Sequence, residues 1–196
     1  MFFAMGLVSS SCTLIGDFLQ LPPIGTQSKN ELLKKWHNRS FFDIIGMNSV
    51  GKARSSEFVK PLSIQYRMNP AIAAIPNKLF YGDILQSGDN TKTRVLSDQW
   101  VQDQPLFLVD TSEGAPWMNR GPNGQSRCNL YHATLAAAMA QDYLANETQD
   151  GKEITVGVVV PYRSQKDLIN DILDESLGKN SPARKRIEVN TVHSFQ

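Results

Sequence analysis

The sequence predicts an α/β fold in which a largely parallel sheet is flanked by helices. Short apolar runs that end in polar or turn residues alternate with longer segments of helical spacing, and this alternation is typical of βαβ units. The clearest strand is 155–160, an unbroken run with several β-branched residues, which predicts a strand buried on both faces. Parallel sheets bind ligands beyond the carboxyl ends of their strands. Polar residues that follow strands are therefore the first candidates for function.

The first half of the chain provides these elements in order. Residues 12–15 are an apolar run closed by a Gly-Asp turn and two prolines, which predicts a strand and a rigid loop. Residues 30–45 have apolar side chains at helical spacing and predict a helix or a helix-turn-helix. Residues 47–57 predict a loop and 59–64 a strand. Asn69 followed by Pro70 predicts the start of a helix, since Asn caps and Pro suits the first turn.

The second half continues the alternation. Residues 87–104 are polar and predict a surface segment, 106–110 predict a strand, and 114–124, with three Gly and two Pro, predict a loop. A long helix is expected over 129–146 and another from 162 onward, because their apolar residues follow helical spacing. A last strand is expected over 186–192.

Composition excludes several classes of protein. With 196 residues, a net charge of +1 and 41% hydrophobic residues, the chain is neither disordered nor a polycation. The charge is segregated, however, because residues 1–67 carry +4, residues 68–150 carry −4 and residues 151–196 carry +1. A partner with phosphate groups would therefore be bound by local positive charge and not by the net charge of the chain. Two cysteines, Cys12 and Cys128, provide neither a zinc cluster nor a disulfide framework, which predicts a reducing, cytoplasmic setting. The apolar opening is too short to span a bilayer, so we expect no membrane partner.

Two loops hold candidate phosphate-binding groups. Asp17 and Gln20 lie three residues apart before two prolines: either Asp17 only caps a turn, or the Gln20 amide is held where it can bind a phosphate oxygen or an attacking water. After the strand at 59–64 come Gln65, Tyr66 and Arg67. The guanidinium of Arg67 can clamp a phosphoryl group and the ring of Tyr66 can stack on a base. The alternative is a core tyrosine beside a surface arginine.

Two strand ends in the second half hold further candidates. Pro161 and Tyr162 precede a helix, whose N-terminal amides favour an anion such as a nucleic-acid phosphate, unless they are simply capped. Thr191 and Ser194 flank the end of the last strand. His193 has no acidic partner in the sequence. The chain has no nucleophile elbow, HExxH motif or paired carboxylates, so protease and glycosidase functions find no support.

Four segments in order, GDFLQLPP, LSIQYRMNP with IPNKLFYGDIL, VGVVVPYRSQ and VNTVHSFQ, resemble motif III, motif IV, the following strand-Pro-Tyr segment and the start of motif V of superfamily 1B helicases. The similarity is to the branch that contains the RNA-surveillance helicase and senataxin. It implies a RecA-like, P-loop NTPase-type fold, mostly the second RecA-like domain. It also implies ATP and Mg²⁺ as cofactors of the intact protein, and single-stranded DNA or RNA as partner.

The resemblance also implies roles for individual residues. Asp17 and Gln20 would sense the γ-phosphate, Tyr66 with Gln65 beside it would bind near the adenine, and Arg67 would be the arginine finger. The nucleic-acid strand would be contacted by Pro161, Tyr162, Thr191 and Ser194. His193 stands where many relatives have Asp, so the resemblance implies no role for it.

The resemblance predicts a domain arrangement as well. Residues 1–27 would form the end of a first RecA-like domain, and residues 58–196 would form most of a second RecA-like domain. Residues 28–57 would connect the two domains. The sequence has no GxxxxGK[ST] motif and no acidic pair before residue 16. A missing N-terminal helicase half is thus the expected partner, and the isolated chain is not expected to hydrolyse ATP. Two alternatives stay open: a non-catalytic nucleic-acid-binding or interaction module with this fold, and a small ATPase half completed by a partner chain with the P-loop.

Overall fold

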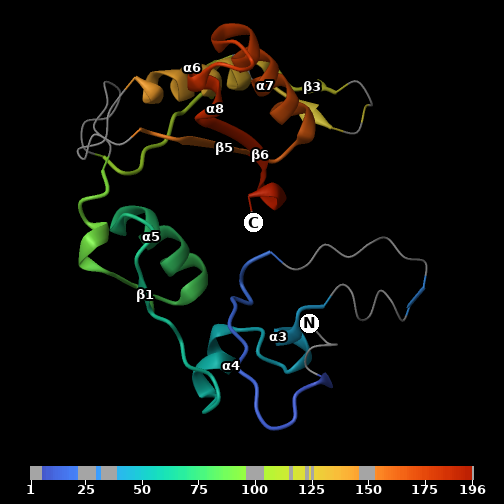
Figure 1. Cartoon of the computed structure of the whole chain (residues 1–196), viewed down its shortest axis with the longest axis vertical. Helices are drawn as coiled ribbons and strands as arrows, with labels where there is room; N and C mark the ends of the chain where they lie inside the picture. The colour runs from blue at the N-terminus through green and yellow to red at the C-terminus, as the bar shows by residue number, and fades with distance from the viewer. Residues whose placement is uncertain are drawn as a thin grey trace. The chain divides into compact units, whose positions relative to one another are not determined.

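A computed structural model describes residues 6–21, 30–31, 39–95, 104–114, 117–121, 124, 126–145 and 153–195. The chain divides into two compact units, residues 1–94 and residues 95–196 (Figure 1). Each unit contains a pair of parallel strands, β1 with β2 in the first and β5 with β6 in the second. The parallel pairing predicted from the alternation of elements is therefore present in both.

The first unit consists of short elements. In chain order these are α3 (Phe41–Ile44), α4 (Val50–Ser55), β1 (Ile64–Gln65), α5 (Pro70–Pro76), the π-helical turn η1 (Asn77–Tyr81), β2 (Gln86–Ser87) and the 3₁₀ turn η2 (Asp89–Thr91). Strands β1 and β2 pair in parallel, with Ile64 opposite Gln86 and Gln65 opposite Ser87. The helical segment α5–η1 is the connection between them.

The predicted start of α5 is confirmed. Asn69 is extended, and its Oδ1 accepts a hydrogen bond from the Ala71 amide at 3.0 Å while Pro70 occupies the first turn. The segment ends at Gly82, whose φ of 59° is the left-handed conformation that glycine adopts without strain. The Asn77 side chain fixes the chain that follows this segment, because it accepts a hydrogen bond from the Leu85 amide and donates one to the Leu85 carbonyl.

Three sequence predictions for the first unit are wrong. Residues 12–15 form no strand, and Ile15 is 82% exposed, because no described segment pairs with them. Residues 50–55 are helical, not a loop, because Ser49 caps the Lys52 amide and satisfies one of the unpaired donors of the first turn. The strand expected over 59–64 is confined to Ile64–Gln65, next to its only described partner.

Within the helix expected over 30–45, Phe41–Ile44 is helical, while residues 32–38 lie outside the described residues.

The second unit has longer elements. In order they are β3 (Asn119–Arg120), β4 (Arg127–Cys128), α6 (Leu130–Leu144), β5 (Val156–Val160), α7 (Arg163–Leu177), α8 (Pro182–Lys185), β6 (Ile187–Thr191) and the 3₁₀ turn η3 (Val192–Ser194). Strands β3 and β4 form an antiparallel hairpin. Strands β5 and β6 are parallel and joined through α7, with Val156 opposite Ile187 and Val160 opposite Thr191. This βαβ unit confirms the strands and helices expected beyond residue 129.

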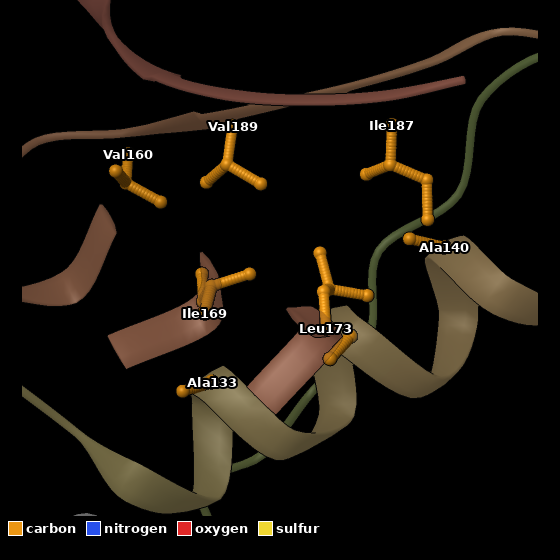
Figure 2. Close-up of a cluster of buried hydrophobic side chains, with 8 residues drawn as sticks. Ala133, Ala140, Val160, Ile169, Leu173, Ile187 and Val189 are labelled. Carbon is orange, nitrogen blue, oxygen red and sulfur yellow. The ribbon is translucent and has the colours of Figure 1, made fainter. Parts of the chain in front are cut away.

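The core of the second unit lies between β5–β6 and the helices α6 and α7. Figure 2 shows side chains from the two strands pointing toward the helices. Ile169 and Leu173 of α7 are 1% and 0% exposed, and alanines of α6 let the helices approach closely. The buried set is Ala133, Ala137, Ala140, Val160, Ile169, Leu173, Ile187 and Val189. Burial of these apolar groups is the main term that stabilises the unit.

Three predictions for this unit are wrong. The segment 106–110 forms no strand, and Leu108 is 90% exposed, since no described strand pairs with it. Strand β5 is not buried on both faces: its burial alternates, and Val159 is 55% exposed, because helices cover only one face among the described residues. The loop expected over 114–124 contains β3, which forms because β4 is available to pair with it.

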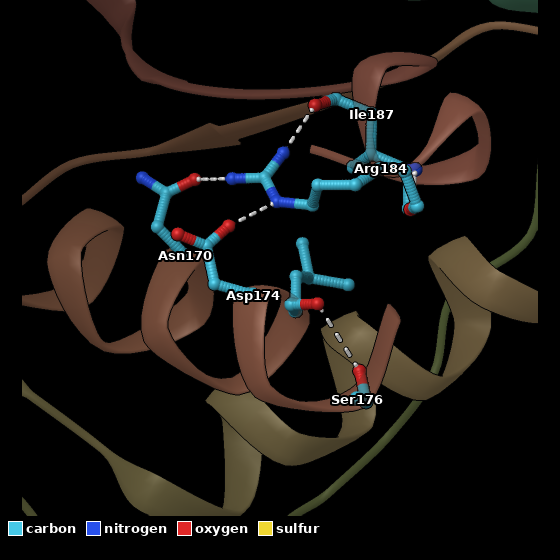
Figure 3. A network of polar contacts seen from close by, with 7 residues as sticks. Asn170, Asp174, Ser176, Arg184 and Ile187 are labelled. Atoms are coloured by element: carbon cyan, nitrogen blue, oxygen red, sulfur yellow. Dashed lines mark hydrogen bonds and ion pairs between the residues drawn. The ribbon is translucent and has the colours of Figure 1, made fainter. Parts of the chain in front are cut away.

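Arg184 ties three elements of the second unit together. Its Nε donates to Asp174 Oδ1 at 2.6 Å, its Nη2 to Asn170 Oδ1 at 2.6 Å and its Nη1 to the Ile187 carbonyl at 2.8 Å (Figure 3). The Arg184 side chain is only 14% exposed. These charge-assisted bonds fix α8 and the start of β6 against α7.

Candidate functional site

The carboxylate of Asp17 organises its own loop. Its Oδ1 accepts from the Leu19 amide at 2.9 Å, and its Oδ2 accepts from Gln20 Nε2 at 3.1 Å. The Gln20 amide nitrogen is therefore oriented by Asp17, while the side chain itself is exposed. Asp17 thus caps the turn and also holds the Gln20 side chain, while the binding of a phosphate oxygen or water by Gln20 stays a prediction. The two prolines that follow lie outside the described residues.

A third side chain, which sequence reasoning missed, joins this pair. Tyr81, the last residue of η1, donates from Oη to Asp17 Oδ2 at 2.5 Å. Burial of the phenol, followed by the hydrogen bond and the charge of Asp17, raises the pKa of Tyr81 to about 12. The only signal in the sequence was the presence of Tyr81 within the segment IPNKLFYGDIL, which gives no hint of its partner.

Gln65 shapes the loop that carries Tyr66 and Arg67. Its Oε1 accepts from the amides of Arg67 at 3.0 Å and Met68 at 2.7 Å, and its Nε2 donates to the Met68 carbonyl and to Ser87 Oγ, both at 2.8 Å. With four hydrogen bonds made inside the protein, Gln65 acts as a positioning residue for its neighbours. It also ties this loop to β2.

Tyr66 lies against the backbone of Gly88. An open pocket of about 450 Å³ is lined by Ile64, Tyr66 and residues 86–90. A Cβ atom at Gly88 would lie 2.5 Å from Tyr66 Cδ1 and closer still to Cε1, so only glycine allows the ring this position. Tyr66 is 58% exposed, which leaves part of the ring free to meet a planar ligand. Tyr66 is therefore not a core residue, and that alternative is wrong.

Gly88 itself is held from both sides. Its amide donates to the Gln65 carbonyl at 2.9 Å, and its carbonyl accepts from the amide and the hydroxyl of Thr91, at 3.0 and 2.6 Å. Thr91 is fully buried. Hydrogen bonds therefore hold the backbone on which the Tyr66 ring rests, and sequence reasoning had assigned no role to Gly88.

The guanidinium of Arg67 is available for an anion. The residue is exposed, and its side chain has no hydrogen bond or ion pair with any residue that the structure describes. Its backbone is nevertheless fixed, because the amide donates to Gln65 and the carbonyl accepts from Arg94 Nη1 at 2.6 Å. No described contact joins Arg67 or Tyr66 to the Asp17–Gln20 pair, although all four lie in the same unit.

In the second unit, four candidate residues lie at the carboxyl end of the β5–β6 pair. Because Val160 lies opposite Thr191 in parallel register, Pro161 and Tyr162 follow β5 at the edge where β6 also ends. Thr191 and Ser194 lie together there, with their hydroxyl oxygens 3.2 Å apart. Tyr162 is 42% exposed. The structure thus gathers aromatic, proline and hydroxyl groups that are far apart in the sequence.

The beginning of α7 is tied to the hairpin and to α6. Ser126 Oγ accepts from the Ser164 amide at 2.9 Å, which favours the capping alternative for that amide. Gln165, 8% exposed, accepts from the Asn129 amide at 2.7 Å and donates to the Asn129 carbonyl at 3.2 Å. The structure shows Gln165 as the link between the N-termini of α6 and α7.

A mainly apolar pocket of about 350 Å³ opens at this edge. Val159, Pro161 and Tyr162 line one part of it, and Arg127 and His132 another. His132 Nε2 lies 2.9 Å from Thr111 Oγ1. The pocket therefore combines surfaces on which a base can stack with a nearby cation. His193 is exposed and does not line it, and Gln196 lies outside the described residues.

These features define a class of protein first. Parallel strands with helices on one face and polar groups at the strand ends are those of a RecA-like α/β domain. Comparison then gives the family: the AAA domain family matches residues 37–196, and the chain belongs to it.

Three relatives make the assignment more specific. The chain is 30% identical over 96% of its length to helicase sen1 of Schizosaccharomyces pombe, 26% over 93% to "Probable helicase senataxin" of Mus musculus, and 25% over 97% to ATP-dependent helicase upf1 of Schizosaccharomyces pombe. It spans 10%, 7% and 19% of those proteins, respectively. The predicted resemblance to superfamily 1B helicases is confirmed.

No helix within the described ranges is long and apolar enough to cross a membrane. Within the same ranges, no group of three or more His, Cys, Asp or Glu side chains could hold a metal ion.

Proposed function

We propose that the chain is the part of an ATP-dependent helicase that grips single-stranded DNA or RNA and responds to the γ-phosphate of ATP. The observation that carries the proposal is that Pro161, Tyr162, Thr191 and Ser194 all lie at the carboxyl end of the paired strands β5 and β6. Stacking on Tyr162 and hydrogen bonds from the two hydroxyls can hold a strand without regard to its sequence. The names of the relatives support the same activity.

The first unit supports the nucleotide side of the proposal. The half-exposed Tyr66 ring beside an open pocket fits an adenine base, and the guanidinium of Arg67, which has no partner among the described residues, fits a phosphate. Gln20, oriented by Asp17, would bind the γ-phosphate or the attacking water. ATP bound with Mg²⁺ would supply the phosphoryl group and its charge neutralisation. We assign no residue of this chain to the metal.

In this proposal, different residues of the chain have different roles in ATP hydrolysis and strand binding. Arg67 would neutralise negative charge that grows on the γ-phosphate oxygens, and its fixed backbone limits the freedom lost on binding. The presence or absence of that phosphate would change the contacts of Gln20, and the change would reach η1 through the hydrogen bonds of Asp17. Tyr162 and its neighbours would hold the strand while the RecA-like domains open and close.

The test measures binding of the purified chain to a fluorescently labelled single-stranded oligonucleotide. We expect binding that weakens steeply with salt, and a loss of about tenfold for Tyr162→Ala, since one stacked base contributes about 1 to 3 kcal/mol. Tyr131→Ala is the matched control, because Tyr131 is 45% exposed against 42% for Tyr162 but does not line the pocket. A chain that does not bind, or equal loss in both variants, would overturn the proposal.

A further inference from the structure

The hairpin β3–β4 places two arginines directly opposite each other. Arg120 and Arg127 are register partners across the antiparallel pair, so their side chains leave the same face of the hairpin. Both are exposed, and neither has an ion pair with any residue that the structure describes. Like charges directly opposite each other destabilise a strand pair. The arrangement therefore has a cost to folding that no described contact offsets.

The hairpin is held close to the strand edge described above. Ser126 accepts a hydrogen bond from the Ser164 amide, so the residues next to each, Arg127 and Arg163, lie at the same end of α7. Gly121 is buried, and a Cβ atom there would overlap Ser164 Oγ, which shows how closely the hairpin packs on the helix. Arg127 also lines the pocket formed by Pro161 and Tyr162. The hairpin therefore places Arg127 at the proposed strand-binding surface, with Arg120 opposite it in the strand pair.

We propose that Arg120 and Arg127 form a phosphate clamp, which extends the nucleic-acid site from the carboxyl end of β5–β6 onto the hairpin β3–β4. This inference rests on the proposed function of that edge. Two guanidinium groups on one face can bind a single phosphate or two successive phosphates, and a bound anion removes the repulsion between them. Bases stacked at Tyr162 and phosphates held by the hairpin would then belong to one strand.

The clamp predicts a particular pattern of binding. Phosphate contacts carry no sequence information, so Arg120→Gln with Arg127→Gln should weaken all single strands equally, by about tenfold near physiological salt. Each phosphate contact contributes about 0.7 to the slope of log affinity against log salt, so the double variant should flatten that slope by about 1.4. Replacement of both by Lys should keep most of the slope. Thermal stability should stay unchanged or rise, because a repulsive pair has been removed.

The control removes the same charge elsewhere in the unit. Lys179→Gln with Lys185→Gln also lowers the net charge by two, at exposed positions near the other end of the fifteen-residue helix α7. That helix is about 22 Å long, beyond a Debye length at physiological salt. The control should bind like the unchanged chain. Tyr162→Ala is measured alongside.

Each outcome decides between the two proposals. If Tyr162→Ala loses affinity while the double Gln variant keeps both affinity and slope, the clamp is refuted and the proposed function stands. If the double Gln and control variants lose affinity equally, the effect is one of net charge and the clamp is refuted as well. If the unchanged chain does not bind single strands, both proposals fail together.

Discussion

Tyr81 donates a hydrogen bond of 2.5 Å to Asp17, 64 positions earlier in the chain, on the same carboxylate oxygen that receives the Gln20 amide. One oxygen therefore links η1, at the end of the helical connection between β1 and β2, to the side chain proposed to sense the γ-phosphate. Any shift of η1 relative to the Asp17 loop must break or lengthen this contact. The link gives a physical route by which the two segments respond to each other.

The raised pKa of Tyr81 makes this link measurable. Its phenol has a pKa of about 12 in the folded chain against 10.0 ordinarily, chiefly because of burial and the Asp17 carboxylate. Below pH 10 the phenol is protonated in both states and the hydrogen bond is fully present. Between pH 10 and 12 the unfolded chain releases the proton while the folded chain keeps it, so the stabilisation falls as pH rises.

Absorbance titration of the five tyrosines should therefore lose one late-titrating phenol in Tyr81→Phe. The stability difference between this variant and the unchanged chain should shrink from pH 10 to 12. Tyr131→Phe is the control, and it should leave the late phenol in place. A late phenol that survives in Tyr81→Phe would show that the contact with Asp17 is absent in solution.

Arg67 and Gln20 are expected to act on turnover rather than on strand binding. In an intact helicase that carries this segment, Arg67→Ala should lower nucleic-acid-stimulated ATP hydrolysis about 10³-fold or more, as expected for an arginine finger. Gln20→Ala should lower it as well. Both variants should keep single-strand affinity, measured by anisotropy, since neither residue lies in the unit that contains β5–β6. Equal loss of turnover and strand binding would instead indicate misfolding.

Gly88 tests the position of Tyr66. Gly88→Ala should weaken binding of an adenine nucleotide about tenfold, because the new methyl group displaces the ring from its place over the backbone. The backbone itself tolerates Ala, since Gly88 has an ordinary extended conformation with φ of −64°. Binding of a fluorescent ATP analogue is the measurement.

Gly51→Ala is the matched control for this change, because a Cβ there meets nothing within 4 Å. It lies within α4 and should slightly raise helix stability, by about 0.5 to 1 kcal/mol, while nucleotide affinity stays unchanged. Unaltered affinity in Gly88→Ala would mean that the Tyr66 ring is not the surface that the base meets.

Arg184 tests what holds the second unit together. Arg184→Ala leaves Asp174 Oδ1, Asn170 Oδ1 and the Ile187 carbonyl without the donors they now have. We expect a loss of about 2 to 3 kcal/mol in the free energy of unfolding, measured by urea denaturation. Lys185→Ala, at the next and exposed position, should change the stability by less than about 0.5 kcal/mol. Similar values for the two variants would contradict the structural role of Arg184.

The sequence by itself determined the elements whose causes are local. The Asn69-Pro70 cap, the α6 and α7 periodicity and the apolar run of β5 each depend on neighbouring residues, and all were predicted. The four ordered motifs also identified the family, which the comparison confirmed. The residues proposed for nucleotide and strand binding follow from those motifs and stay predictions.

Only the tertiary structure decided features that depend on which other segment lies alongside, whether that segment is near or far in the chain. Residues 12–15 and 106–110 look like strands but lack a described neighbour to pair with, whereas Arg127 and Cys128 pair because β3 lies beside them. The bond from Tyr81 to Asp17, the closeness of Gly88 to Tyr66 and the opposition of Arg120 and Arg127 arise in the same way. Hydrogen bonding, close packing and charge repulsion act through space, and spacing along the sequence does not record which groups they will join.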